Sequence, residues 1–178
     1  ISGVKISSIC AVVPARVLKF EDELKEFPFP ESSSRRLGKV MGFREHRIAD
    51  PKTTLIDLAA YGINCLFKEG VIKKEDIDCL VFSSQVREHL VPGNSKVLHG
   101  FLNLSRNTHC IDLYENCTGF ISGLYTACSI MRASNLNCVL LVVSNSGCCY
   151  ANKKDRNTYP LAGDAAGIAV ISRADEKE

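Results

Sequence analysis

The chain has 178 residues, is 46% hydrophobic and 24% charged, and carries a formal net charge of +2. These values are typical of one compact domain, residues 1–178, and exclude the strong basic bias of a nucleic-acid-binding protein. No continuous apolar stretch reaches the ~18 residues that a membrane span needs, and residues 1–14 do not resemble a signal peptide. We therefore expect a cytoplasmic protein that binds neither nucleic acid nor membranes.

Nine cysteines lie mostly inside apolar runs, at positions 10, 65, 79, 110, 117, 128, 138, 148 and 149. A chain of this length and hydrophobicity does not need a disulfide framework, so we interpret most of them as reduced, buried side chains. There is no C-x-x-C pair, and the four histidines do not show the spacing of metal ligands. We expect no metal site and no bound cofactor.

The first fifty residues give a mixed pattern. Residues 4–13 read as a strand and residues 20–27 as a short helix. Residues 32–43 are polar and basic and turn at Gly42, and residues 44–50 alternate weakly, as a short edge strand does.

From residue 53 onward the predicted strands and helices alternate. They are a helix over 53–70 capped by threonine, a strand over 77–85, a helix over 94–104 capped by Asn94 or Ser95, a strand over 109–114, a helix over 118–134, and strands over 137–146 and 163–173. This order predicts an α/β fold with a mainly parallel sheet covered by helices.

Cys117 stands in "YENCTGFISG", between the strand 109–114 and the helix that follows. Functional sites of parallel α/β sheets gather at the carboxyl ends of strands, and a helix N-terminus stabilises a thiolate. Two interpretations remain open from the residues alone: a catalytic nucleophile, or one more core cysteine.

The helix after Cys117 carries small residues four apart, at Gly119, Gly123 and Ala127, with Phe120 and Leu124 on a neighbouring face. Small residues at this spacing let another backbone come close. We therefore expect this helix to be buried on several sides, against a second helix that lies outside this domain.

Four segments in order resemble β-ketoacyl-acyl-carrier-protein synthase III, of the thiolase superfamily. They are "MGFREHRIAD", "TTLIDLAAYGINCLFKEGVIKKEDIDCLVFSS", "ENCTGFISGLYTACSIMRASNLNCVLLVVSNS" and "DRNTYPLAGDAAGIAVIS". The resemblance covers nearly the whole chain. It implies the N-terminal thiolase-like half of such an enzyme, with a five-stranded mixed, mostly parallel sheet, while the family's C-terminal half is absent from these 178 residues.

The resemblance also implies a mechanism. Cys117 would attack an acyl thioester and hold the acyl group covalently, and a malonyl-acyl-carrier-protein would then lose carbon dioxide and condense with it. This is an acyltransferase reaction of fatty acid or polyketide-like synthesis. The family's catalytic His and Asn lie in its second half, so the isolated fragment is expected to be inactive.

The resemblance also implies three substrate-binding residues in this chain. Arg156 matches an arginine that meets the coenzyme A nucleotide, Val91 matches a residue that lines the acyl pocket across a dimer interface, and Phe120 follows the cysteine. The family's second coenzyme A arginine has no clear match, and its stacking tryptophan is missing, with Arg36 near that place. These departures favour an acyl group delivered on a carrier protein.

The expected partners are acyl carrier protein, acyl-coenzyme A or another acyl thioester, and a second copy of the chain in a homodimer. The alternative is a non-catalytic thiolase-fold partner that scaffolds a carrier protein or an active subunit. Chalcone-synthase-like and hydroxymethylglutaryl-synthase-like activities also remain open. Among the histidines only His89, which follows the strand 77–85, is expected near Cys117.

Overall fold

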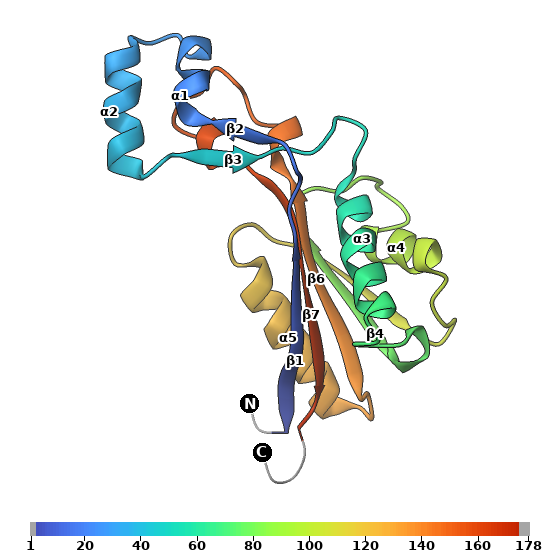
Figure 1. Ribbon diagram of the computed structural model, residues 1–178. Coiled ribbons are helices and arrows are strands. Elements are labelled where there is room, and N and C mark those ends of the chain that lie inside the picture. Colours follow the sequence, from blue (N-terminus) through green and yellow to red (C-terminus); the bar gives the residue numbers. More distant parts are fainter. Residues whose placement is uncertain (1–2, 175–178) are drawn as a thin grey trace.

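In the computed structural model, which describes residues 3–174, one five-stranded sheet has the strand order β1-β7-β6-β4-β5. The strands are β1 (Val4–Val12), β4 (Cys79–Ser84), β5 (His109–Tyr114), β6 (Cys138–Ser146) and β7 (Asp164–Arg173). β4 pairs in parallel with β5 and with β6, whereas β7 is antiparallel to both β6 and β1. The sheet is therefore mixed, and the carboxyl ends of β1, β4, β5 and β6 meet at one rim, at the top of Figure 1.

The two faces of the sheet are covered by different helices (Figure 1). Helices α3 (Leu55–Lys68) and α4 (Asn94–Leu102) pack on one face, and α5 (Gly119–Ala133) packs on the other. Side chains alternate between the faces as a pleated strand requires. In β4, Leu80 and Phe82 join the core under α3 and α4, while Cys79 and Val81 join the core under α5.

The start of α3 follows the sequence prediction. Thr54 is the N-cap, and its side chain and that of Asp57 accept each other's backbone N–H, which satisfies two otherwise unpaired donors. The cap of α4 was predicted wrongly, because the residue in the cap position is Gly93 rather than Asn94 or Ser95. Ser95 lies inside the helix, where its N–H and its hydroxyl both donate to Asp112 of β5.

A smaller unit, which we call the outer lobe, stands on the rim of the sheet (Figure 1). It contains β2 (Val17–Lys19), α1 (Phe20–Glu23) with a 3-10 turn Leu24–Glu26, α2 (Glu31–Met41), β3 (Glu45–Arg47) and the connection 147–163. β2 pairs antiparallel with β3, and a separate core of Phe20, Leu24, Phe27 and Tyr159 holds the lobe together.

The polar segment 32–43 forms most of helix α2, which the sequence pattern did not predict. Only a narrow face is buried, at Ser34 and Gly38. A side chain at Gly38 would overlap the ring of Phe20, so the missing Cβ lets the helix lie against the lobe core. Tertiary contact of this kind overrides the weak helix propensity of a serine-rich segment.

A buried contact between His46 and Glu23 also holds the outer lobe together. His46 Nε2 lies 3.0 Å from Glu23 Oε1, and its Nδ1 lies 2.5 Å from the carbonyl oxygen of Ala162. The ring therefore bridges Glu23 of α1 and the backbone of the connection 147–163. This geometry makes His46 a packing residue of the outer lobe.

Candidate active site

Cys117 lies in the turn between β5 and α5, at the rim of the sheet. The turn is held by backbone hydrogen bonds from Glu115 to Ser84, 3.2 Å, and from Gly119 to Asn116, 3.0 Å. The hydroxyl of Thr118 donates to Glu115 at 3.3 Å. The strand-to-helix crossover therefore fixes the backbone around Cys117 through its own neighbours and through the end of β4.

Exposure sets Cys117 apart from the other cysteines. Among the eight whose side chains the structure describes, Cys117 alone is exposed to solvent, and none of the eight is in a disulfide. The side chain of Cys149 lies outside the described part. Burial raises the pKa of Cys79 and of Cys138 to about 12, so these two core thiols stay protonated.

The small residues of helix α5 pack against this chain's own sheet. A Cβ on Gly119 would lie 2.6 Å from Ser83 Oγ, a side chain on Gly123 would overlap Leu141, and Ala127 is fully buried. The small residues thus face this chain's own sheet, and the second helix from outside the domain stays a prediction that concerns the other faces of α5, where Ile121 and Tyr125 are exposed. The glycines bring α5 down onto β4 and β6, which puts Cys117 directly beyond the strand ends.

Ser83 is the residue near the site that sequence reasoning missed. Its side chain is completely buried under the first turn of α5, and its hydroxyl has no hydrogen-bond partner among the described residues. The side-chain oxygen of Asn145, near the end of β6, is likewise buried and unpaired. Their positions near the ends of β4 and β6 are the only sequence signal that could have indicated them.

The expected substrate-binding residues occupy different parts of the rim. Phe120, in the first turn of α5, is 37% exposed, and Val91 is 88% exposed on the loop 85–93 that follows β4. Arg156 lies instead in the outer lobe, where its guanidinium stacks 3.9 Å from the ring centroid of Phe29 and donates to Ser33 Oγ at 2.9 Å. Two of the three positions thus share the β4–β5 end of the rim with Cys117.

The histidines are distributed as the sequence order predicts. His109 begins β5, at the opposite end of the sheet, and His99 lies in α4, where its Nε2 is 2.8 Å from the carbonyl oxygen of Ser105. His89 is exposed on the same loop as Val91. No hydrogen bond joins Cys117 to a histidine in residues 3–174.

The loop 85–93 is fixed at its base and exposed at its tip. Asn94, fully buried, donates to Ser84 Oγ and to the carbonyl oxygen of Val86, both at 3.0 Å. Glu88 accepts the N–H of Ile56 at the start of α3, 3.0 Å. The tip residues Leu90 and Val91 remain 82% and 88% exposed.

Within the described residues, no helix is long and apolar enough to cross a membrane, and no group of three or more His, Cys, Asp or Glu side chains is arranged to hold a metal ion.

Comparison with known proteins agrees with this arrangement. Residues 111–178, which include the Cys117 turn, match the family model of 3-oxoacyl-[acyl-carrier-protein] synthase III. A putative 3-oxoacyl-[acyl-carrier-protein] synthase 3 of Campylobacter jejuni is 31% identical over 175 residues, which are 98% of this chain and 49% of that relative. The chain is a 3-oxoacyl-[acyl-carrier-protein] synthase III-like protein.

Solved structures extend the likeness to the fold of the synthase III-like chain. A crystal structure of a 3-oxoacyl-(acyl-carrier-protein) synthase III superposes with a TM-score of 0.88 at 25% identity, over 99% of this chain and 51% of that one. A 3-oxoacyl-(acyl-carrier-protein) synthase of Burkholderia xenovorans superposes with a TM-score of 0.91 at 24% identity, over 98% of this chain and 49% of that one. The thiolase-like fold with its five-stranded mixed sheet is thereby confirmed. The chain spans about half the length of the relatives that it matches.

Proposed function

We propose that Cys117 is the nucleophile of a condensing enzyme. Its thiolate attacks the carbonyl carbon of an acyl thioester, the bond from that carbon to the donor sulfur breaks, and the donor leaves as a thiol after it takes up a proton. The observation that carries this proposal is the exposure of Cys117 alone among the described cysteines, at the strand-end rim of a synthase III-like fold.

In the second step, a malonyl-acyl-carrier-protein loses carbon dioxide and its carbanion attacks the Cys117 acyl group, which forms a carbon–carbon bond and frees the thiol. The names of the relatives support the carrier-protein substrate and a place in fatty acid synthesis. We further propose a cytoplasmic homodimer in which Val91 and Phe120 line the acyl pocket and Arg156 meets the donor.

Acylation of Cys117 tests the first step. The protein is incubated with acetyl-coenzyme A or with acetyl-loaded acyl carrier protein, and intact mass and peptide mapping locate the added acetyl group. We expect one acetyl group on Cys117 and none in a Cys117→Ala variant, which should fold normally because the residue lies in an exposed turn. Cys110→Ala, which removes a half-buried thiol from β5, is the matched control and should still be acetylated.

The alternative, a non-catalytic scaffold, makes the opposite prediction. A scaffold needs no reactive thiol, so acetylation would be absent and iodoacetamide would label Cys117 no faster than an ordinary exposed thiol. We also propose that the 178-residue polypeptide alone forms no carbon–carbon bond, because no histidine is hydrogen-bonded to Cys117 within residues 3–174. Product formation by that polypeptide from acetyl and malonyl donors would contradict this part.

A further inference from the structure

Cys10 and Cys65 lie on neighbouring elements at the sheet edge opposite Cys117. Cys10 belongs to the edge strand β1, and Cys65 belongs to helix α3, which packs beside that strand. Both side chains are partly exposed, so a small oxidant in solution can reach them. Cys117 follows β5, at the other edge of the sheet. The pair is therefore separate from the proposed acylation site.

The directions of β1 and α3 bring these two cysteines to the same level of the sheet. β1 runs toward the rim and α3 runs away from it, so the two elements are antiparallel (Figure 1). A Cβ on Gly62 would overlap the side chain of Val12 and would lie 3.7 Å from Cys10 Sγ, which places Gly62 between the levels of these two residues. Cys65 comes about one turn later, about 4.5 Å farther from the rim along the helix axis. This step carries it from the level of Gly62 to that of Cys10.

Cys65 also lies on the side of α3 that faces β1. Leu58 borders a hollow together with residues 14–15, which come soon after β1 ends, and Gly62 meets Cys10. Residues at i, i+4 and i+7 of a helix share one face, so Cys65 continues the stripe that Leu58 and Gly62 begin. The pKa of the Cys10 thiol agrees with this placement, because burial and the nearby Cys65 both raise it.

Cys79 and Cys110 show what sets this pair apart. They stand on the paired strands β4 and β5, but Cys79 joins the core under α5, whereas Cys110 packs against the core under α3 and α4. The sheet lies between their thiols, so a bond between them would require the strands to turn over. Cys10 and Cys65 meet on one face of the sheet and need no such change.

We propose that Cys10 and Cys65 form a redox modification site, at which hydrogen peroxide converts the two thiols to a disulfide that ties β1 to α3. The Cys65 thiolate attacks one peroxide oxygen, the O–O bond breaks, and the departing hydroxide takes up a proton and leaves as water. The Cys10 sulfur then attacks the Cys65 sulfur, the S–O bond of the sulfenic acid breaks, and a second water leaves with the Cys10 proton. The two thiols thus lose two electrons, which the peroxide gains, and a thiol reductant reverses the bond.

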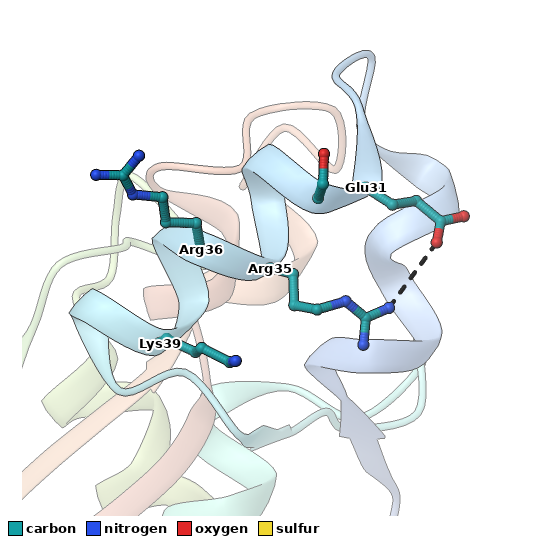
Figure 2. Close-up of a pocket in the computed structure, with 5 residues that line it drawn as sticks. Glu31, Arg35, Arg36 and Lys39 are labelled. Atoms are coloured by element: carbon teal, nitrogen blue, oxygen red, sulfur yellow. Dashed lines mark ion pairs between the residues drawn. The ribbon is translucent and has the colours of Figure 1, made fainter.

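The disulfide encloses residues 11–64, which include β2, α1, α2 and β3 of the outer lobe. In this segment Arg35 of α2 is paired with Glu21 of α1 at 2.5 Å, and Figure 2 shows its second pair, with Glu31, at 3.9 Å. Exposed ion pairs of this kind stabilise a fold only slightly. Because a covalent link across the segment restricts the unfolded chain, the oxidised protein should melt about 5–10 °C above the reduced protein.

Peptide mapping tests the bond directly. The full chain, with Cys117→Ser to remove the exposed thiol, is treated with hydrogen peroxide, blocked with N-ethylmaleimide and digested with trypsin without reduction. Trypsin releases peptides 6–16 and 53–68, and each contains one cysteine. We expect the two peptides joined in one product that dithiothreitol separates. Melting of the oxidised and reduced protein, followed by circular dichroism, gives the second readout.

Two variants and one control decide the outcome. Cys10→Ser and Cys65→Ser should each abolish the cross-linked product and the rise in melting temperature, whereas Cys110→Ala, which removes a half-buried thiol from β5, should keep both. Two thiols that stay free after treatment, or a sulfinic acid on Cys65 without the cross-link, would overturn the proposal, because Cys10 would then lie out of reach. A cross-link that joins only two copies of the chain, or an oxidised form that melts below the reduced one, would also refute it.

Discussion

Asp112 offers a direct test of how the sheet holds the loop beside Cys117. Its carboxylate accepts the N–H of Ser95 at 2.7 Å, the hydroxyl of Ser95 at 2.7 Å and the ammonium of Lys96 at 2.9 Å. A side chain on Gly93 would overlap this carboxylate, so the glycine is required for the start of α4 to approach β5. Asp112 thus replaces the missing side-chain cap of α4 and ends the loop 85–93.

These contacts set the loss of stability that we expect when Asp112 is replaced. A hydrogen bond to a charged group contributes about 1.5–3 kcal/mol, and the Lys96 contact is discounted because that side chain is half exposed. We expect Asp112→Ala to lower the free energy of unfolding by about 2–4 kcal/mol and Asp112→Asn, which keeps one acceptor, by about 1–2 kcal/mol.

The contribution of Asp112 to the free energy of unfolding should fall as the pH is lowered. Burial tends to raise the pKa of Asp112, but the hydrogen bonds from Lys96 and Ser95 outweigh it and hold the pKa below its usual value. A carboxyl with a depressed folded pKa stabilises the fold above its unfolded pKa of ~3.9 and loses this contribution as the pH falls through the folded value. The stability difference between wild type and Asp112→Asn should therefore be full near neutral pH and shrink below about pH 4.

Urea unfolding followed by circular dichroism measures these differences, and hydrogen exchange of residues 85–95 reports the loop directly. Exchange there should accelerate in Asp112→Ala. Asp155→Asn is the control for loop exchange, since the Asp155 carboxylate lies in the outer lobe and accepts the backbone N–H of Asn157 and the hydroxyl of Thr158 there. A difference between wild type and Asp112→Asn that stays constant from neutral pH to pH 3 would refute the assignment of the stabilisation to the ionised carboxylate.

Three further outcomes are expected in urea unfolding. His46→Ala removes the buried partner of Glu23 and should cost about 1–3 kcal/mol, part of which Glu23→Gln should restore in the double variant; additive losses would contradict the pair. Burial raises the pKa of Cys79 and of Cys138 to about 12, so above ~pH 8.5 these thiols ionise only in the unfolded state. Each thiol should therefore lower the free energy of unfolding by ~1.4 kcal/mol for every pH unit above ~8.5. The double variant Cys79→Ala/Cys138→Ala should lose this part of the pH dependence. Gly123→Val, which overlaps a core leucine of β6, should destabilise by about 1–3 kcal/mol, and an unchanged midpoint would show that α5 can move away from the sheet.

The main sheet could be predicted because its strands carry a strong local signal. The first six residues of β6 are apolar, the strand is buried on both faces, and the helices between strands repeat their apolar residues at helical spacing. The same order of elements placed Cys117 at a strand-to-helix turn, which the structure confirms. Local pattern and tertiary position agree there because a crossover connection leaves little choice of geometry.

The outer lobe was predicted poorly because its signals are not local. Strand β2 has three residues and forms only by pairing with β3, some thirty positions later in the chain. Helix α2 is stabilised by packing on Phe20, and Arg156 reaches Ser33 across 123 positions of sequence. The unpaired hydroxyl of Ser83 was equally hidden, since a serine near the end of a buried strand reads as an ordinary sheet residue.

The strand order divides the rim of the sheet into two sides. β1, β7 and β6 connect to the outer lobe, whereas the Cys117 turn follows β5 and the exposed Leu90 and Val91 follow β4, at the other side of the sheet. Under the proposed function, the acyl chain held on Cys117 would extend toward this apolar loop tip. Substitutions at Leu90 and Val91 should accordingly alter which acyl chain reacts, and should leave the folding of the sheet unchanged because both side chains are exposed.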